Sequence, residues 1–229
     1  MKPPTLFFFA LGLAQSLPAF AQTSPAPASA ATTATAGAAA TTTDADAAYT
    51  KTITDRSEKI VDALGFAEPA KKIIIRDILV AHYRVLHTID EVRDPKLAAA
   101  KQLTDKAAKD AATKTATDES EAKRYVEHTE FETKLAAELT PEQVDKVKDG
   151  LTSNALRTNY DAFTKKFPDL AEEQKKQILT WFTAARELAI DGGSSDEKLA
   201  FFIKYRGRVN NYLSAAGYDL KTGQKKSAN

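Results

Sequence analysis

Apolar residues recur every three or four positions from Tyr49 to about Leu220, which is the period of an amphipathic α-helix. No stretch alternates apolar and polar residues for long enough to predict a strand. The pattern predicts an all-α protein, folded as an antiparallel bundle of about six or seven helices. Breaks in the pattern place these helices at residues 49–65, 69–94, about 125–139, 141–150, 156–167, 169–192 and 195–216.

Short signals mark several helix starts. Residues 140–143, Thr-Pro-Glu-Gln, supply an N-cap, a first-turn proline and a capping-box partner. Asp169 and Glu172 can cap the sixth helix in the same way, and Ser194 or Ser195 can cap the seventh.

The second helix is expected to end at Asp94-Pro95, because proline cannot donate the backbone hydrogen bond that continues a helix. Residues 96–121 then lack an apolar face, so they predict either a solvated helical arm or a mobile excursion. The apolar stripes of the third and sixth helices are Tyr125, Phe131, Leu135 and Leu139, and Ile178, Phe182, Ala185 and Leu188, with Trp181 at the rim of the latter.

The seventh helix carries two apolar stripes instead of one. The first, which reads as its core face, consists of Leu199, Phe202, Ile203, Val209 and Leu213. Arg206 and Asn210 fall in the middle of this face. Since a buried guanidinium needs a partner, we expect Arg206 to meet a carboxylate or the carbonyl groups at a helix end.

The second stripe places three rings and a cation along one line: Phe201, Tyr205, Arg208 and Tyr212. Aromatic faces stack on the apolar side of sugar rings, and an arginine fork holds a carboxylate by two hydrogen bonds. The stripe therefore predicts a binding site for a carbohydrate or uronate. The alternative is that it packs against the first helix or against residues 96–121.

The N-terminus has the parts of a secretory signal peptide: Lys2, an apolar stretch through residues 7–11, and Ala19-Phe20-Ala21 before the expected cleavage after Ala21. Residues 22–48, rich in Ala, Thr, Ser and Pro, predict a disordered spacer, and residues 221–229 a C-terminal tail. We therefore expect a helical domain at residues 49–220, exported to the periplasm or outside the cell, without a transmembrane segment in the mature chain.

Composition and missing motifs exclude several functions. With 32 basic and 31 acidic residues, the chain lacks the excess of cations that nucleic-acid binding requires. It has no cysteine, so it cannot form disulfides or use a thiol nucleophile. The nucleophile elbow, zincin and dinucleotide-binding motifs are absent.

Three histidines are the remaining candidates for metal ligands. His82 lies among apolar residues, which favours a hydrogen-bonded core histidine, and His87 can pair with Glu91 one turn later. We interpret His128 as a similar structural residue. We therefore expect no metal site and no cofactor.

Two segments, Leu139–Gly150 (LTPEQVDKVKDG) and Lys204–Tyr218 (KYRGRVNNYLSAAGY), resemble an uncharacterised family of exported bacterial proteins, domain-of-unknown-function family 3826. The similarity spans about Tyr49 to Leu220. It implies no established activity, cofactor or catalytic residue, and its implied setting is bacterial degradation of plant-type polysaccharide.

A looser similarity links the chain to small periplasmic helical chaperones with L-T-x-x-Q repeats, through Leu139–Gln143 and, without the threonine, Leu170–Gln174. The leading hypothesis is a binding or accessory module whose partner is a carbohydrate or an exported protein. The alternatives are a holdase-type chaperone, and an enzyme that acts on polysaccharide through carboxylates.

Overall fold

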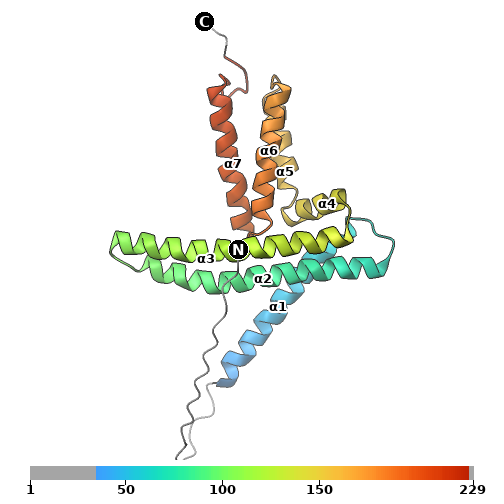
Figure 1. Ribbon diagram of the computed structural model, residues 1–229, viewed down its shortest axis with the longest axis vertical. Helices are drawn as coiled ribbons and strands as arrows, with labels where there is room; N and C mark the ends of the chain where they lie inside the picture. Colours follow the sequence, from blue (N-terminus) through green and yellow to red (C-terminus); the bar gives the residue numbers. More distant parts are fainter. Residues whose placement is uncertain (1–34, 227–229) are drawn as a thin grey trace, which may run out of the picture. The chain divides into compact units, whose positions relative to one another are not determined.

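The computed structural model describes residues 35–226, with side chains from residue 44 onward. The expected signal peptide and its cleavage after Ala21 lie outside the described residues, as does the first part of the spacer. Within residues 35–226 the chain forms seven helices and no strand, which confirms the all-α class. They are α1 (Thr35–Asp62), α2 (Pro69–Lys101), α3 (Lys106–Glu138), α4 (Pro141–Leu151), α5 (Ala155–Lys166), α6 (Glu172–Ala189) and α7 (Ser195–Ala215) (Figure 1). None of these helices has a stretch both long and apolar enough to cross a bilayer.

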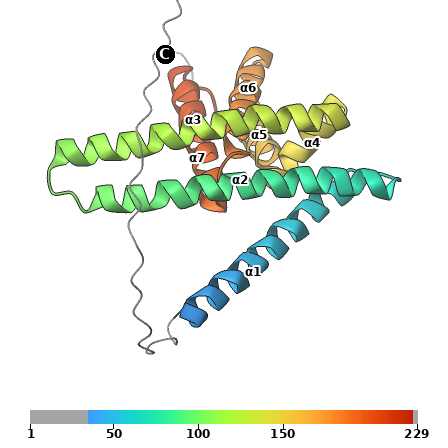
Figure 2. The ribbon, with the colours of Figure 1, turned by 60° about the horizontal axis from the view of Figure 1, so that its bottom comes forward.

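Helices α2 and α3 lie side by side as a long hairpin, closed by the loop at residues 102–105 (Figures 1 and 2). They run in opposite directions: Lys71 near the start of α2 pairs with Glu138 at the end of α3, and Lys96 pairs with Glu119 at the other end. These two ion pairs therefore join the helices near both ends of the hairpin.

The tip of this hairpin differs from the sequence prediction. Helix α2 continues through Pro95 to Lys101, so the expected end at that proline is wrong. Residues 96–101 and 106–121 are helical, and Ala100 and Ala116 are buried between the two helices. Packing against α3 compensates for the hydrogen bond that the proline cannot make. Of the two structures expected for residues 96–121, the helical arm is the one observed.

The described side chains bury two apolar clusters, not the single core expected of one bundle. The first joins α1, α2, α3 and α4 and contains, among others, Ile53, Leu79, Phe131, Leu135 and Val147. The second joins α5, α6, α7 and the segment after α7 and contains, among others, Phe167, Phe182, Phe202, Val209, Leu213 and Tyr218. The antiparallel arrangement of the whole set stays a prediction.

One expected core residue of the third helix and one of the sixth lie on the surface. Tyr125 is 75% exposed and Leu188 is 44% exposed, because the helices that carry them are covered on one side only. Helix α1 begins at Thr35, earlier than the expected start at Tyr49. Alanine, the strongest helix former, is frequent in residues 35–48, which explains how the helix extends into the expected spacer.

The sequence signals predict the start of α4 correctly but not the start of α6. The capping box of α4 is confirmed: the Thr140 hydroxyl accepts from the Gln143 N–H, and the Gln143 side chain accepts from the Thr140 N–H at 3.0 Å. Helix α6 starts at Glu172, and its flanking residue is Ala171 and not Asp169. There, the Gln174 side chain accepts from the Ala171 N–H.

Candidate functional site

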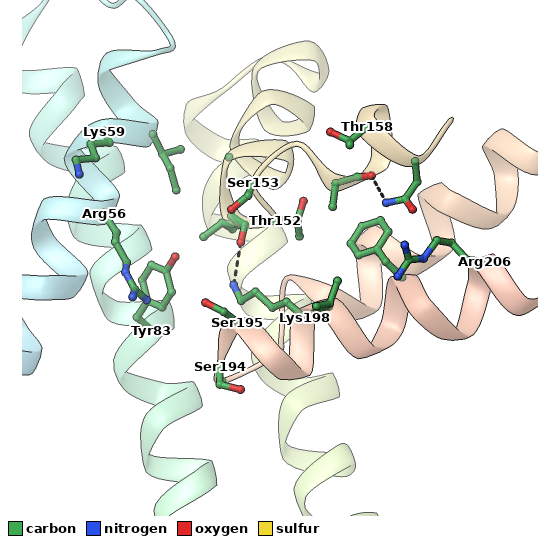
Figure 3. A pocket seen from close by; sticks show the side chains of 18 of the residues that line it. Arg56, Lys59, Tyr83, Thr152, Ser153, Thr158, Ser194, Ser195, Lys198 and Arg206 are labelled. Atoms are coloured by element: carbon green, nitrogen blue, oxygen red, sulfur yellow. Dashed lines mark hydrogen bonds between the residues drawn. The ribbon is translucent and has the colours of Figure 1, made fainter. Parts of the chain in front are cut away.

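A cleft of about 760 Å³ opens between α1, α2, the α4–α5 connection and the first half of α7 (Figure 3). Four cations line it: Arg56 and Lys59 from α1, and Lys198 and Arg206 from α7. No aspartate or glutamate is among its lining residues. None of the four cations forms an ion pair within the described part of the chain, whereas the other described arginines, apart from Arg208, do. The cleft is therefore a concentration of positive charge without counter-charge.

Hydroxyl and amide groups fill the spaces between these cations. The polar side chains on this part of the wall are Thr152, Ser153, Thr158, Asn159, Ser194 and Ser195. Helices α5 and α7 both begin at the cleft, so the positive ends of two helix dipoles add to the side-chain charges. This combination can hold an anion that also carries hydroxyl groups.

The turn between α4 and α5 has an unusual backbone. Ser153 and Asn154 have φ angles of 52° and 57°, in the left-handed region that residues with a side chain seldom adopt. The Asn154 N–H donates to the Asp149 carbonyl at 2.7 Å and holds the turn closed. Gly150 precedes it because a Cβ there would lie 3.0 Å from Ile60 of α1. The strained turn therefore brings the α4–α5 wall close to α1.

Lys198 lies at the inner end of the cleft. Its ammonium group donates to the Leu151 carbonyl at 3.0 Å and lies 5.3 Å from the centre of the Tyr83 ring. Burial lowers the pKa of Lys198 to about 8. The charge of Asp191 opposes this shift, and the charges of Arg56 and Arg124 add to it.

The glycines before α7 make room for Lys198 and its neighbours. A Cβ on Gly192 would lie 2.8 Å from Lys198 Cγ, and one on Gly193 would lie 1.6 Å from Asp90 Oδ2. Next to them, the Ser194 hydroxyl caps α7 by accepting from the Glu197 N–H at 3.1 Å, as one of the two expected caps. The start of α7 is thus fixed against α2.

A network of ion pairs holds this junction together. Asp90 pairs with Arg93 and Arg124, and Glu197 pairs with Arg93 at 2.7 Å and accepts from the Gly193 N–H at 2.9 Å. Partial burial raises the pKa of Asp90 despite its two arginine partners. These carboxylates are committed to structure, so they leave the cleft cations free.

Two histidines extend the network into the core. His82 is buried, with Nδ1 2.9 Å from Glu127 Oε1 and Nε2 3.3 Å from the Ile190 carbonyl, which confirms the hydrogen-bonded core histidine. His128 Nδ1 lies 2.8 Å from Asp191 Oδ2, and this hydrogen bond raises the pKa of His128. The second oxygen of Asp191, Oδ1, is buried without a hydrogen-bond partner among the described residues.

One cluster has the composition of a metal site. Ligand atoms of His128, Glu132 and Glu187 lie within 4.8 Å of one another. The Lys148 ammonium pairs with both glutamates, at 2.5 Å from Glu187. It thus supplies the positive charge that the two carboxylates need.

The residues of the second stripe on α7 do not line the cleft. Arg208 lies over the Trp181 ring of α6, 4.7 Å from its centre, and Tyr212 meets the same ring edge-on at 5.2 Å. Phe201 and Tyr205 are half-buried against the second apolar cluster. The stripe therefore packs in part against α6, and its role in ligand binding stays a prediction.

The residues of the first stripe divide between core and surface. Phe202, Val209 and Leu213 are buried, but Leu199 and Ile203 are each 51% exposed. The expected burial of Arg206 against a carboxylate or the carbonyl groups of a helix end is wrong, since its side chain is exposed at the cleft. Helix α7 packs mainly on α6, and this one-sided support leaves part of its apolar face uncovered.

A sequence model of a family described as "Protein of unknown function (DUF3826)" matches residues 50–229. The chain belongs to the DUF3826 family. A search of curated proteins finds no match. Every residue of the cleft lies within the DUF3826 match, including those of α1.

Sequence reasoning missed three of the four cations in this cleft: Arg56, Lys59 and Lys198. In the sequence they look like ordinary charged positions on the polar sides of helices. The signal that was available is Gly192 before Lys198, because a glycine leaves space for the lysine side chain to fold back.

Proposed function

We propose that the protein is a binding module for an acidic, hydroxyl-bearing ligand of the uronate-saccharide class, which it holds in the cleft. The observation that carries this proposal is the gathering of four cations without ion-pair partners on walls that contain no carboxylate. Among the other described arginines, all except Arg208 find counter-charges within the chain. A cleft that lacks them is suited to counter-charges brought by a ligand.

The geometry favours a carboxylate that carries hydroxyl groups over a bare anion. The exposed guanidinium groups of Arg56 and Arg206 can each donate two hydrogen bonds to a carboxylate. The serine, threonine and asparagine side chains between them suit the hydroxyl groups of a sugar. The volume of the cleft, about 760 Å³, lies in the range of small-molecule sites, which is roughly 300–1,000 Å³.

The test is calorimetric titration with trigalacturonate and with a neutral trisaccharide. We expect binding of the acidic sugar only, and Arg206→Ala to weaken it about tenfold to a hundredfold, the loss of one charged hydrogen-bonding group. Lys204→Ala is the matched control, because Lys204 is an exposed cation two residues away on α7 but outside the cleft. Equal affinity of Arg206→Ala and the unmodified protein would overturn the proposal.

The second stripe of α7 remains the other candidate for the same ligand class. Trp181 joins Arg208 and Tyr212 in a partly exposed aromatic group, which is suited to stacking on a sugar ring. The double variant Tyr205→Ala/Arg208→Ala tests it in the same titration. A loss of affinity in that variant, with Arg206→Ala unaffected, would move the site to this stripe. The chaperone and enzyme hypotheses stay predictions.

A further inference from the structure

Lys198 differs from the other cleft cations in its surroundings. Arg56 and Arg206 are exposed, but the Lys198 side chain is partly buried and ends beside the Leu151 carbonyl and the face of Tyr83. No carboxylate lies within ion-pair distance of it among the described residues. Figure 3 shows it crossing the space between α7 and the α4–α5 turn.

A comparison with Lys148 shows what this environment does. Lys148 is buried, but two glutamates pair with it, and the pKa of Lys148 is raised. Lys198 is partly buried without a carboxylate partner, and its pKa falls to about 8. About a tenth of Lys198 is therefore the neutral amine near neutral pH, against well below a thousandth for an ordinary lysine. Only the neutral amine has the lone pair that attacks a carbonyl carbon.

We propose that Lys198 forms an imine with the carbonyl group of an anionic ligand held in the cleft, such as the open-chain aldehyde end of a uronate. The inference rests on the proposed function, since the other cations would hold the carboxylate while the carbonyl carbon faces Lys198. It assigns the cleft a covalent step in addition to binding.

The step balances without an oxidant or a further reactant. The Lys198 lone pair forms the C–N bond, and the carbonyl oxygen takes up a proton from solvent. Nitrogen loses one proton, which gives the carbinolamine. Its hydroxyl group then takes up a second proton and leaves as water as the C–O bond breaks, and nitrogen releases its second proton to solvent. The products are one imine and one water molecule. The tyrosine beside the amine stays protonated, because burial raises the pKa of Tyr83.

Reductive trapping tests the inference. The protein is incubated with glyoxylate, a small anionic aldehyde, and cyanoborohydride, and adducts are located by peptide mass spectrometry. We expect Lys198 to be labelled at least about tenfold faster than surface lysines, in line with its larger neutral fraction. Propanal, which has no charge, should label it more slowly than glyoxylate.

Variants separate the amine chemistry from charge and folding. Lys198→Arg keeps the positive charge but cannot form the imine, so the fast label should vanish while helicity by circular dichroism is unchanged. Lys204→Ala is the matched control on the exposed side of α7 and should leave the label in place. Labels spread evenly over surface lysines, or equal rates with propanal and glyoxylate, would overturn the inference.

The failure of this inference is distinguishable from failure of the proposed function. A trigalacturonate methyl glycoside has no free carbonyl group, so its calorimetric titration reports binding alone. Binding of that glycoside without any Lys198 adduct would leave the binding function standing and reduce Lys198 to a binding cation. If the glycoside does not bind and no Lys198 adduct forms, both the binding function and the imine are refuted.

Discussion

Replacing Lys198 by methionine should stabilise the protein near neutral pH, although it removes a residue of the proposed site. Methionine keeps most of the apolar stem that packs beside Gly192 and removes the buried charge. The pKa of Lys198 falls from 10.5 to about 8 in the folded protein, so folding disfavours its charged form. One pKa unit corresponds to about 1.4 kcal/mol, which makes the penalty about 3 kcal/mol at most. The lost hydrogen bond to Leu151 reduces the net gain to about 1–3 kcal/mol.

The sign of the pH dependence identifies the cause. The pKa of Lys198 is lower in the folded protein than in the unfolded chain, so the unfolded chain takes up a proton first as the pH falls from 10.5. The unmodified protein therefore loses stability until the pH reaches about 8. The penalty is fully present below pH 8 and absent well above pH 10.5. The advantage of Lys198→Met in urea unfolding should therefore shrink by about 2 kcal/mol between about pH 7 and pH 9.5.

The matched control is Lys204→Met, an exposed position on the same helix, whose effect should stay within about 0.5 kcal/mol at every pH. An advantage of Lys198→Met that does not change with pH, or a variant that is destabilised near neutral pH, would refute the view that this lysine is a buried, uncompensated charge.

Two further outcomes concern the junction around the cleft. Gly193→Ala should lower the free energy of unfolding by about 1–3 kcal/mol in urea titrations, because its Cβ would displace the ion-paired Asp90 carboxylate. Gly207→Ala lies in mid-helix with open space around it, so it should instead raise the free energy of unfolding by about 0.5–1 kcal/mol. The raised pKa of His128 predicts that its hydrogen bond to Asp191 stabilises the fold fully below about pH 6.5 and that this contribution is lost as the pH rises through the folded value. The stability difference between the unmodified protein and His128→Asn should therefore shrink from about pH 6 to pH 9, and a constant difference would contradict this assignment.

Local signals predicted the helices, and tertiary contacts decided where those signals were insufficient. The Thr140 capping box and the Ser194 cap act within four residues, so the sequence alone places both helix starts correctly. Pro95 is also a strong local signal, but contact with α3 outweighs it and the helix continues. Leu199 and Ile203 follow the helical period without being buried, because periodicity defines a face and not what covers it.

The candidate site was less predictable, because it depends on which helices meet. Arg56 and Lys198 are far apart in the sequence, and only the packing of α1, α2 and α7 brings them to one cleft. The second stripe of α7 drew attention to a helix that lines the cleft. Its neighbour Arg206, interpreted from the sequence as a buried structural residue, is the one that reaches the cleft.

The walls of the cleft come from both apolar clusters, with Ile60 and Leu151 from the first and Phe202 from the second. A fragment that ends before α7 or begins after α1 would retain only part of the cleft wall, even if its remaining helices folded. Occupancy of the cleft would in turn fasten the two clusters to each other and raise the melting temperature of the whole domain. Ligand screening by thermal shift therefore requires the intact helical domain.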